Sequence, residues 1–205
     1  MKLFFHYCSY GFSNCYVLGS ERPEEPGALI VDPAVMDEQI VGFLEENDYP
    51  LLGVLVTHDH IKHVRGLRTL KRIYETKIYA INPHVNEHRT VMVWDADTVN
   101  IGPFKIEVIA TPGHSSDSAV FRVERLLFTG DSLSAGLVGR TASAYGAAVQ
   151  MTALRSKILS LPGDFTILPA HGPPSTLETE RRYNDGINGF DEISGRRPKF
   201  KLDLS

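Results

Sequence analysis

Three histidines lie close together in the segment THDHIKH, which covers positions 57–63. The segment follows LLGVLV, an apolar run at positions 51–56 of the kind that forms a buried strand. Neutral imidazole is the commonest metal ligand in proteins, because it donates a lone pair without adding charge. Histidines at this spacing can also lie on a solvated loop, so the segment alone is weak support for a metal site.

Three further residues of metal-ligand type each follow another apolar run after a short turn. They are His114 after FKIEVIA, Asp131 after LLF and His171 after FTIL. Open α/β folds place their sites at strand ends, so these side chains are expected to meet the histidines of the first segment. The sequence therefore predicts one metal centre with six candidate ligands: His58, His60, His63, His114, Asp131 and His171.

This pattern resembles the metallo-β-lactamase superfamily, whose signature HxHxDH is followed by a separate His, an Asp and a last His. The resemblance implies a first metal site made by four residues: His58, His60, His114 and Asp131. It implies a second site that shares Asp131 and adds His63 and His171. The chain has Lys62 where the signature has its Asp. An ammonium group has no lone pair to give a metal, so the second site is altered.

The resemblance also implies the fold, a four-layer αββα sandwich. Two stretches resemble the glyoxalase II-like branch, GDSLSAGLVGRT at positions 130–141 and LPAHGPPSTLETERRYN at positions 168–184. Apolar periodicity alone indicates only a mixed α/β protein, with no linker and no internal repeat. We therefore expect a single domain over residues 1–205.

The activity implied by these ligands is that of a metal-dependent hydrolase. Bound zinc would activate a water for attack on a small ester, thioester or lactone. We expect one zinc ion, with iron or a second metal left open, and assign catalytic roles to Asp131, Lys62 and His171. Lys62 is expected to stand in for the second cation and to pair with Asp131, or else to be a neutral amine.

The substrate is less well defined, and two other classes of function remain open. Glyoxalase II has a helical C-terminal domain that binds glutathione, whereas only a short tail follows His171 here, so hydroxyacylglutathione is not favoured. The first alternative is a mononuclear iron persulfide dioxygenase, which would use His58, His114 and Asp131. The second is a catalytically weak binding module on the same fold.

The secondary structure that must position these residues follows from the apolar pattern. We expect an antiparallel opening pair of strands at 3–7 and 16–18, and two hairpins at 98–109 and 119–128. Helices are expected at 37–46, capped by Asp37, and at 63–74, after the histidine segment. Two closing helices are expected at 151–161 and 177–183. Asn82 and Pro83 are expected to open a short helix that carries His84 and His88. That spacing can bind metal. No other ligand accompanies the pair, so we interpret it as non-binding.

Other polar residues near the ligands have less specific interpretations. Ser115 and Ser116 read as turn residues, because no His and Asp remain free to activate a serine nucleophile. Asp59 and Asp117 could orient the second nitrogen of a ligand or cap helices. Tyr145 is as consistent with lining a substrate pocket as with ordinary packing.

Composition excludes several kinds of partner. The chain has 205 residues, 42% of them hydrophobic and 22% charged, with a net charge of -4, which offers no electrostatic footprint for nucleic acid. The sequence has no apolar run of about 18 residues that could form a membrane helix, and the first residues lack a signal-peptide core. We therefore expect a cytoplasmic protein with a small-molecule substrate, two free thiols at Cys8 and Cys15, and an oligomeric state that the sequence leaves open.

Overall fold

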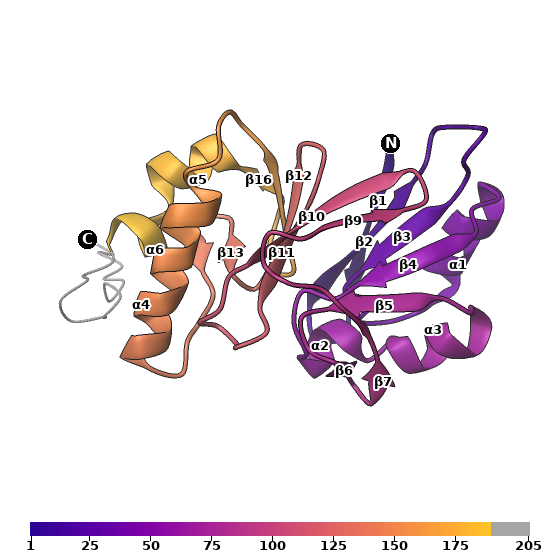
Figure 1. Cartoon of the computed structure of the whole chain (residues 1–205), viewed down its shortest axis with the longest axis horizontal. Coiled ribbons are helices and arrows are strands. Elements are labelled where there is room, and N and C mark those ends of the chain that lie inside the picture. The colour runs from indigo at the N-terminus through magenta and orange to yellow at the C-terminus, as the bar shows by residue number, and fades with distance from the viewer. Residues whose placement is uncertain (190–205) are drawn as a thin grey trace, which may run out of the picture.

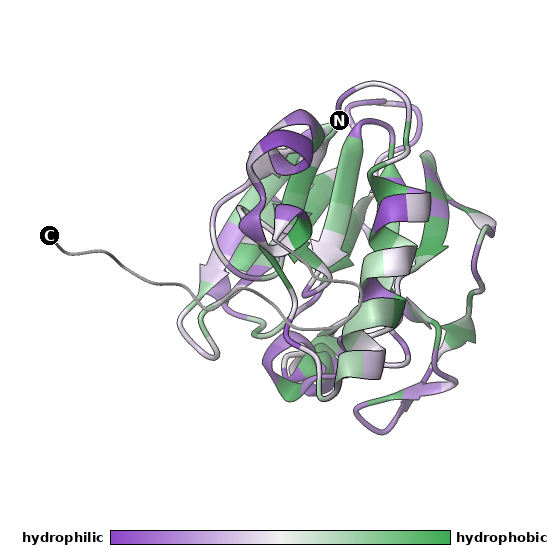
Figure 2. Cartoon of the chain, turned by 90° about the vertical axis from the view of Figure 1, so that its left-hand side faces the viewer, coloured by the Kyte–Doolittle hydropathy of each residue, from purple (hydrophilic) through white to green (hydrophobic). Residues whose placement is uncertain are grey.

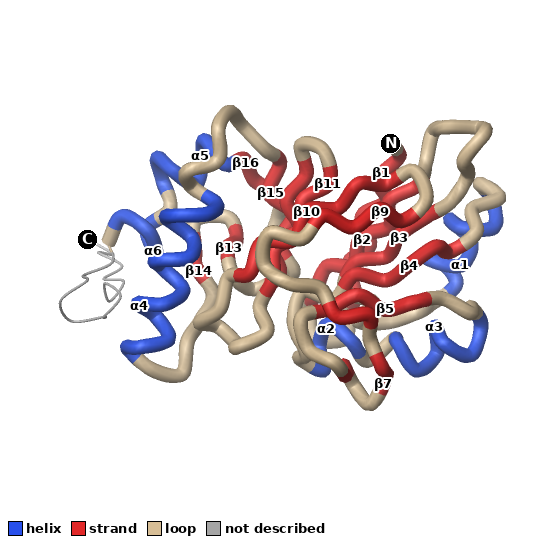
Figure 3. The backbone as a smooth tube through the Cα atoms, viewed as in Figure 1, coloured by secondary structure: helices blue, strands red, loops and turns tan. Residues whose placement is uncertain are grey.

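Two sheets lie between two groups of helices in the computed structural model, which describes residues 1–189 (Figure 1). Strands occupy the middle of the molecule and helices its two flanks (Figure 3). The order is therefore helix, sheet, sheet, helix, and the expected αββα sandwich is confirmed. The polar stretch at positions 194–205 lies outside the described residues.

The first sheet is built from the N-terminal half of the chain. Its strands run in the order β1, β2, β3, β4, β5 and β8, with bounds Lys2–Cys8, Ser13–Gly19, Ala28–Val31, Leu51–Leu55, Lys77–Ala80 and Val91–Met92. The first three strands pair antiparallel, and the others pair parallel from β3 onward. The expected opening pair and the buried strand before the histidine segment are both present.

The second sheet comes from the C-terminal half. Its strands run in the order β16, β15, β12, β11, β10 and β9, with bounds Ser175–Thr176, Thr166–Pro169, Leu126–Gly130, Ala119–Val123, Phe104–Ala110 and Thr98–Ile101. Both expected hairpins, β9 with β10 and β11 with β12, are confirmed. Two short hairpins lie outside the sheets, β6 (His84–Val85) with β7 (His88–Arg89) and β13 (Leu133–Ser134) with β14 (Leu137–Val138).

The helices cover the outer faces of the sheets. On the first sheet lie α1 (Glu38–Glu46), α2 (Ile61–Val64) and α3 (Leu67–Ile73). On the second lie α4 (Ala144–Ala153), which continues into a π-helical turn at Leu154–Ile158, then α5 (Leu177–Tyr183) and α6 (Asp185–Asn188). Asp37 caps α1 as expected, because its carboxylate accepts from the backbone N–H groups of Gln39 and Ile40.

Three apolar cores hold the four layers together. The central core joins side chains of both sheets, such as Tyr16 from β2 and Phe128 from β12, whose rings meet edge to face with centroids 5.5 Å apart. An outer core lies between each sheet and its helices. In the side view of Figure 2, hydrophobic positions concentrate on the strands behind the helices, and hydrophilic ones lie mainly on loops and on parts of the outer helices. Burial of these apolar faces fixes the sheets against each other.

Three expected helices differ in the structure. The helix expected at 63–74 is divided into α2 and α3 around Gly66. The backbone of Gly66 lies so close to that of Pro33 that a Cβ atom would be 2.4 Å from the Pro33 carbonyl oxygen. The helix expected from Met151 begins at Ala144, capped by the Ser143 hydroxyl. The short helix expected to carry His84 and His88 is wrong. These histidines flank a hairpin turn with positive φ at positions 86 and 87.

The two cysteines are free and buried, with 1% and 0% of their surfaces exposed. Burial raises the pKa of the Cys8 thiol to about 11, and it raises the pKa of the Cys15 thiol as well. The thiolate is the reactive form, so both are expected to behave as inert core side chains. Within the described part of the chain, no helix combines the length and the hydrophobicity needed to cross a membrane.

Candidate metal centre

The predicted ligands come together where strands of both sheets end. His58 and His60 lie in the loop after β4 and His63 in α2, whereas His114, Asp131 and His171 follow β10, β12 and β15. Parallel strands of one sheet end at one edge, and the facing sheet brings its own strand ends to the same place. The structure thus unites all six side chains that the sequence singled out, in two groups that share Asp131.

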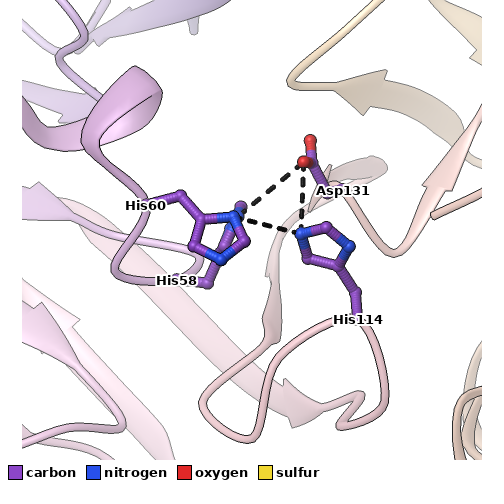
Figure 4. A group of neighbouring side chains, drawn as sticks. All are labelled: His58, His60, His114 and Asp131. Carbon is purple, nitrogen blue, oxygen red and sulfur yellow. Dashed lines mark hydrogen bonds and ion pairs between the residues drawn. The ribbon is translucent and has the colours of Figure 1, made fainter. Parts of the chain in front are cut away.

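The first group has the geometry of a four-ligand metal site (Figure 4). His60 Nδ1 lies 2.9 Å from His58 Nε2 and 3.2 Å from His114 Nε2. Asp131 Oδ2 lies 3.3 Å from His114 Nε2 and 3.8 Å from His58 Nε2. Four ligand atoms bound tetrahedrally at about 2.0 Å lie roughly 3.3 Å from one another. These donors therefore fit one zinc-sized ion.

The second group has three ligands among residues 1–189. Asp131 Oδ1 lies 3.6 Å from His63 Nε2 and 3.5 Å from His171 Nε2. The two oxygens of Asp131 thus face different groups, as a bridging carboxylate would. Two histidines and one shared oxygen make a weaker site than three histidines and one oxygen, because each lost ligand removes a donor bond.

Hydrogen bonds behind the ligands fix which ring nitrogen carries the lone pair. His114 Nδ1 lies 2.6 Å from the Arg140 carbonyl oxygen, and His171 Nδ1 lies 2.8 Å from that of Phe12. A carbonyl oxygen only accepts, so both Nδ1 atoms carry the proton. Each Nε2 therefore presents its lone pair toward Asp131, as metal-bound histidines require.

Thr57 does the same for His58, and the Asp32 carboxylate lies behind both buried histidines. The Thr57 hydroxyl donates to Asp32 Oδ2 at 2.7 Å and lies 3.1 Å from His58 Nδ1, from which it can accept. The other carboxylate oxygen accepts the Thr57 backbone N–H at 2.8 Å, and Asp32 Oδ2 lies 3.4 Å from His63 Nδ1. Sequence reasoning missed Asp32, although an acid directly after the buried strand β3 was a usable signal.

The protonation of the ligands follows from burial and from their neighbours. Burial, with a smaller effect of His63, lowers the pKa of His58 to about 3. Burial also lowers the pKa of His60, with help from His114. The pKa of His63 is raised to about 9, because contacts with Asp131 and Asp32 outweigh the opposing effect of burial. Burial would raise the pKa of Asp131, but His63, His58 and His171 lower it. His58 and His60 are therefore neutral imidazoles and Asp131 is a carboxylate at neutral pH.

Lys62 lies in the first turn of α2 with an exposed side chain. The expected ion pair with Asp131 is absent, since the ion pairs of Asp131 within residues 1–189 are all with histidines. Four imidazoles already surround that carboxylate and occupy the positions from which the ammonium group could contact it. The stem of Lys62 instead passes over Gly11, where a Cβ atom would lie 2.9 Å from it.

A cavity of about 380 Å³ opens over the ligands. It is lined by His114, Asp131 and His171 of the two groups and by Ser134, Leu137 and Val138 of the β13–β14 hairpin. Five residues outside the hairpin complete the lining: Gly11, Lys62, Gly130, Gly139 and Arg140. A volume of this size suits a small-molecule substrate. Tyr145 lies outside this lining, on α4, with 80% of its surface exposed.

Two buried polar residues hold the hairpin wall of the cavity. The Glu180 carboxylate accepts from Gly136 N at 3.1 and 3.3 Å, and Asn184 Nδ2 donates to the carbonyl oxygens of Ser134 and Leu137 at 3.3 and 3.1 Å. Both side chains are fully buried on α5 or at its end. These contacts, which join residues about 45 positions apart, gave no signal in the sequence.

The remaining polar candidates support the loops rather than the ligands. Ser115 Oγ lies 2.7 Å from Ser118 Oγ, as expected of a turn residue. Asp117 accepts the backbone N–H of Asp59 at 2.9 Å and the side-chain amide of Asn82 at 2.9 Å. Asp59 in turn accepts the backbone N–H of Asn86 at 3.1 Å. These acids thus hold the histidine loop in place. The role of contacting the second nitrogen of a ligand, expected of Asp59 or Asp117, falls to Asp32.

Asp32→Asn should weaken metal binding roughly 10- to 100-fold, the usual effect of losing a hydrogen-bond partner behind a ligand. Either orientation of the new amide sets its NH₂ group against a donor, the N–H or the hydroxyl of Thr57. If the hydroxyl turns to donate to His58 Nδ1, the proton of that ring moves to Nε2 and blocks its lone pair.

Competition with a chromophoric zinc chelator measures this affinity. Asp48→Asn is a matched control, because Asp48 has a φ of 52° beside 50° at Asp32 but lies exposed at the surface. Equal zinc affinity in Asp32→Asn and in the native protein would contradict the role of Asp32.

Comparison with known proteins identifies the family of the chain. Residues 9–174 match the family described as the metallo-beta-lactamase superfamily. A probable metallo-hydrolase of Bacillus subtilis is 29% identical over 208 residues, which cover 87% of this chain and 93% of that protein. A hydroxyacylglutathione hydrolase of Idiomarina loihiensis is 31% identical over 162 residues, which cover 78% of this chain but only 62% of that longer protein.

Solved structures agree in fold. ETHE1 from Myxococcus xanthus superposes with a TM-score of 0.83 at 25% identity, and the match covers 95% of this chain and 88% of that one. The BLEG-1 B3 metallo-beta-lactamase superposes with a TM-score of 0.80 at 24% identity, covering 92% of this chain and 100% of that one. The layered fold is thus an arrangement found in solved proteins.

Proposed function

The chain belongs to the metallo-β-lactamase superfamily, and from that premise we propose that it is a metal-dependent hydrolase of a small ester, thioester or lactone. One observation carries the proposal. Three imidazoles, those of His58, His114 and His171, direct Nε2 toward a single carboxylate, and a hydrogen bond behind each ring holds its Nδ1. Nε2 lone pairs this close to one another and to a carboxylate repel unless a cation lies between them.

The first group is the preferred place for one zinc ion, held by four residues: His58, His60, His114 and Asp131. Bound there, the metal supplies a Lewis acid that lowers the pKa of a water and polarises a carbonyl oxygen. The donor set of three nitrogens and one oxygen suits zinc and also suits iron.

The chain's own residues then handle substrate and protons. The proposed catalytic residues are Asp131, His171 and Lys62. Asp131 Oδ1 lies 3.6 Å from His63 Nε2 and 3.5 Å from His171 Nε2, so its negative charge faces both rings. With only the first group loaded, His171 Nε2 keeps its lone pair free to accept a proton inside the cavity. The Lys62 ammonium, also in the cavity lining, stabilises negative charge that develops on the acyl oxygen.

An iron persulfide dioxygenase is the second candidate. Its three ligands would be His58, His114 and Asp131, and these converge without His60, at 3.8 and 3.3 Å from Asp131 Oδ2. Metal identity separates the two candidates. Zinc favours hydrolysis, and iron with oxygen consumption on glutathione persulfide favours the dioxygenase.

Removal and return of the metal test the hydrolase proposal directly. The protein as purified is analysed for zinc and iron, and its hydrolysis of a panel of p-nitrophenyl esters, thioesters and lactones is measured. Dialysis against dipicolinate should lower that hydrolysis at least about a hundredfold, because the proposed reaction needs the metal as a Lewis acid. One equivalent of zinc should restore it. Unchanged hydrolysis in the metal-stripped protein would show that the site is not the source of activity.

A further inference from the structure

A buried glutamine on α4, Gln150, contacts the loops that carry two of the metal ligands. Only 1% of its surface is exposed, and the other buried residues of that helix are apolar. Its Nε2 donates to the carbonyl oxygen of Ser132 at 3.0 Å, and Ser132 directly follows the ligand Asp131. The amide is therefore bonded to the residue next to the carboxylate that both ligand groups share.

The same side chain also packs against two glycines of the site. Gly113 lies directly before His114, and a Cβ atom on that glycine would be 2.4 Å from Gln150 Cβ. A Cβ atom on Gly139 would be 3.0 Å from Gln150 Nε2 and 1.8 Å from the Asp131 carbonyl oxygen. Gln150 thus lies against the backbone beside one ligand and against a glycine that contacts the backbone of another.

These contacts bear on the distance between two ligands of the first group. His114 Nε2 lies 3.3 Å from Asp131 Oδ2, and the two side chains face each other in Figure 4. They follow β10 and β12 of the second sheet, and the residue before His114 and the residue after Asp131 both contact Gln150. A site of this kind tolerates displacements of only about 0.5 Å, so the position of this one side chain affects the fit of a metal.

A glutamine at this position has a cost in stability. Gln150 Oε1 is buried, and no group in residues 1–189 donates a hydrogen bond to it. A buried acceptor without a partner destabilises the folded state, whereas an unbranched apolar side chain of the same length does not. The Ser132 carbonyl oxygen would keep a donor without Gln150, because the backbone N–H of Gly139 donates to it at 3.3 Å. Stability therefore does not account for an amide at this position.

We propose that Gln150 is a positioning residue of the metal centre, whose amide sets the separation of His114 and Asp131 and acts on the metal only through them. The inference rests on the metal site of the hydrolase function proposed above and requires metal binding but not turnover. Gln150 makes metal binding tighter while it makes the metal-free protein less stable.

Gln150→Met tests the proposal, because methionine has the same length and lacks the amide. Zinc affinity, measured by competition with a chromophoric chelator, should fall about tenfold, as for other residues that orient a ligand. The melting temperature of the metal-free variant should equal that of the native protein or exceed it. The visible absorption spectrum of the cobalt-substituted variant should shift, since those bands depend on the ligand geometry. Gln150→Leu, which is one atom shorter, should have the same three effects and replaces the methionine variant if that one does not fold.

Ile158→Val is the matched control. It shortens a fully buried side chain of the same outer core, in the π-helical turn that continues α4. It should lower the melting temperature and leave both the zinc affinity and the cobalt spectrum unchanged. Native zinc affinity in the Gln150 variants would overturn the inference, and so would a lower metal-free melting temperature with an unshifted cobalt spectrum. Absence of hydrolysis by the native protein would contradict the hydrolase proposal alone, because all three measurements are made without substrate.

Discussion

His114→Ala should remove most of the bound metal and lower hydrolysis by more than about a hundredfold, the upper range for losing a partner that only supports a ligand. The side chain supplies one of four donors in the first group, and its Nε2 lies within 3.3 Å of two others. The fold should persist, because His114 lies at the cavity and belongs to none of the three apolar cores. Elemental analysis, circular dichroism and ester hydrolysis measure the three effects.

His84→Ala is the matched control for this prediction. It removes a histidine from the exposed β6–β7 hairpin, which contributes to neither ligand group among the described residues. Metal content and hydrolysis should both stay at the native level. Full hydrolysis by metal-stripped His114→Ala would mean that the catalytic site lies elsewhere.

Lys62→Asp should raise the metal content from one to two ions per chain. The second group has three donors, and an aspartate at position 62 would restore the fourth that the family signature contains. It would also remove a positive charge that repels a second dication, an effect that solvent partly screens at an exposed side chain. Because ~1.4 kcal/mol changes affinity tenfold, the added ligand and the lost repulsion together should raise the affinity for the second ion at least tenfold. Elemental analysis at neutral pH in modest zinc excess gives the count.

Lys62→Gln separates the two causes. It removes the charge without adding an anionic ligand, so its second zinc should bind more tightly than in the native protein but less tightly than in Lys62→Asp. Two tightly bound ions in the native protein would refute the role assigned to Lys62. The competing interpretation, that Lys62 marks an inactive protein, predicts no hydrolysis by the native chain and recovery in Lys62→Asp.

The ligand set could be predicted from the sequence because its signals are local. Each ligand follows an apolar run and a short turn, and parallel strands bring such turns together whatever the rest of the chain does. The helix at 38–46 was predictable for a similar reason, since Asp37 and the apolar period lie in one segment. The hairpin at 84–89 was misread, because two histidines four residues apart fit a helix equally well until Asn86 and Glu87 adopt positive φ.

The partners in the supporting contacts could not be predicted, because they join distant segments. The place of Asp32 after β3 marks it as a candidate but does not indicate what it contacts. Asp32 meets Thr57 across 25 positions, and Asn184 reaches Leu137 across 47. The pairing expected between Lys62 and Asp131 was wrong for the same reason, since only the folded chain places four imidazoles around that carboxylate. Nothing in the local sequence gives the direction of a side chain relative to another sheet.

The first ligand group draws His58 and His60 from the end of one sheet and His114 and Asp131 from the end of the other. A bound ion would thus act as a cross-link between the two halves of the molecule, in parallel with the central core. The affinity of the site for the ion would then depend on the alignment of the two sheets, since a relative displacement of about 1 Å is comparable to the tolerance of a metal site. A substitution such as Phe128→Leu in the central core would then be registered as faster zinc release while the secondary structure is still whole. The rate of zinc release would therefore report on the relative position of the two sheets.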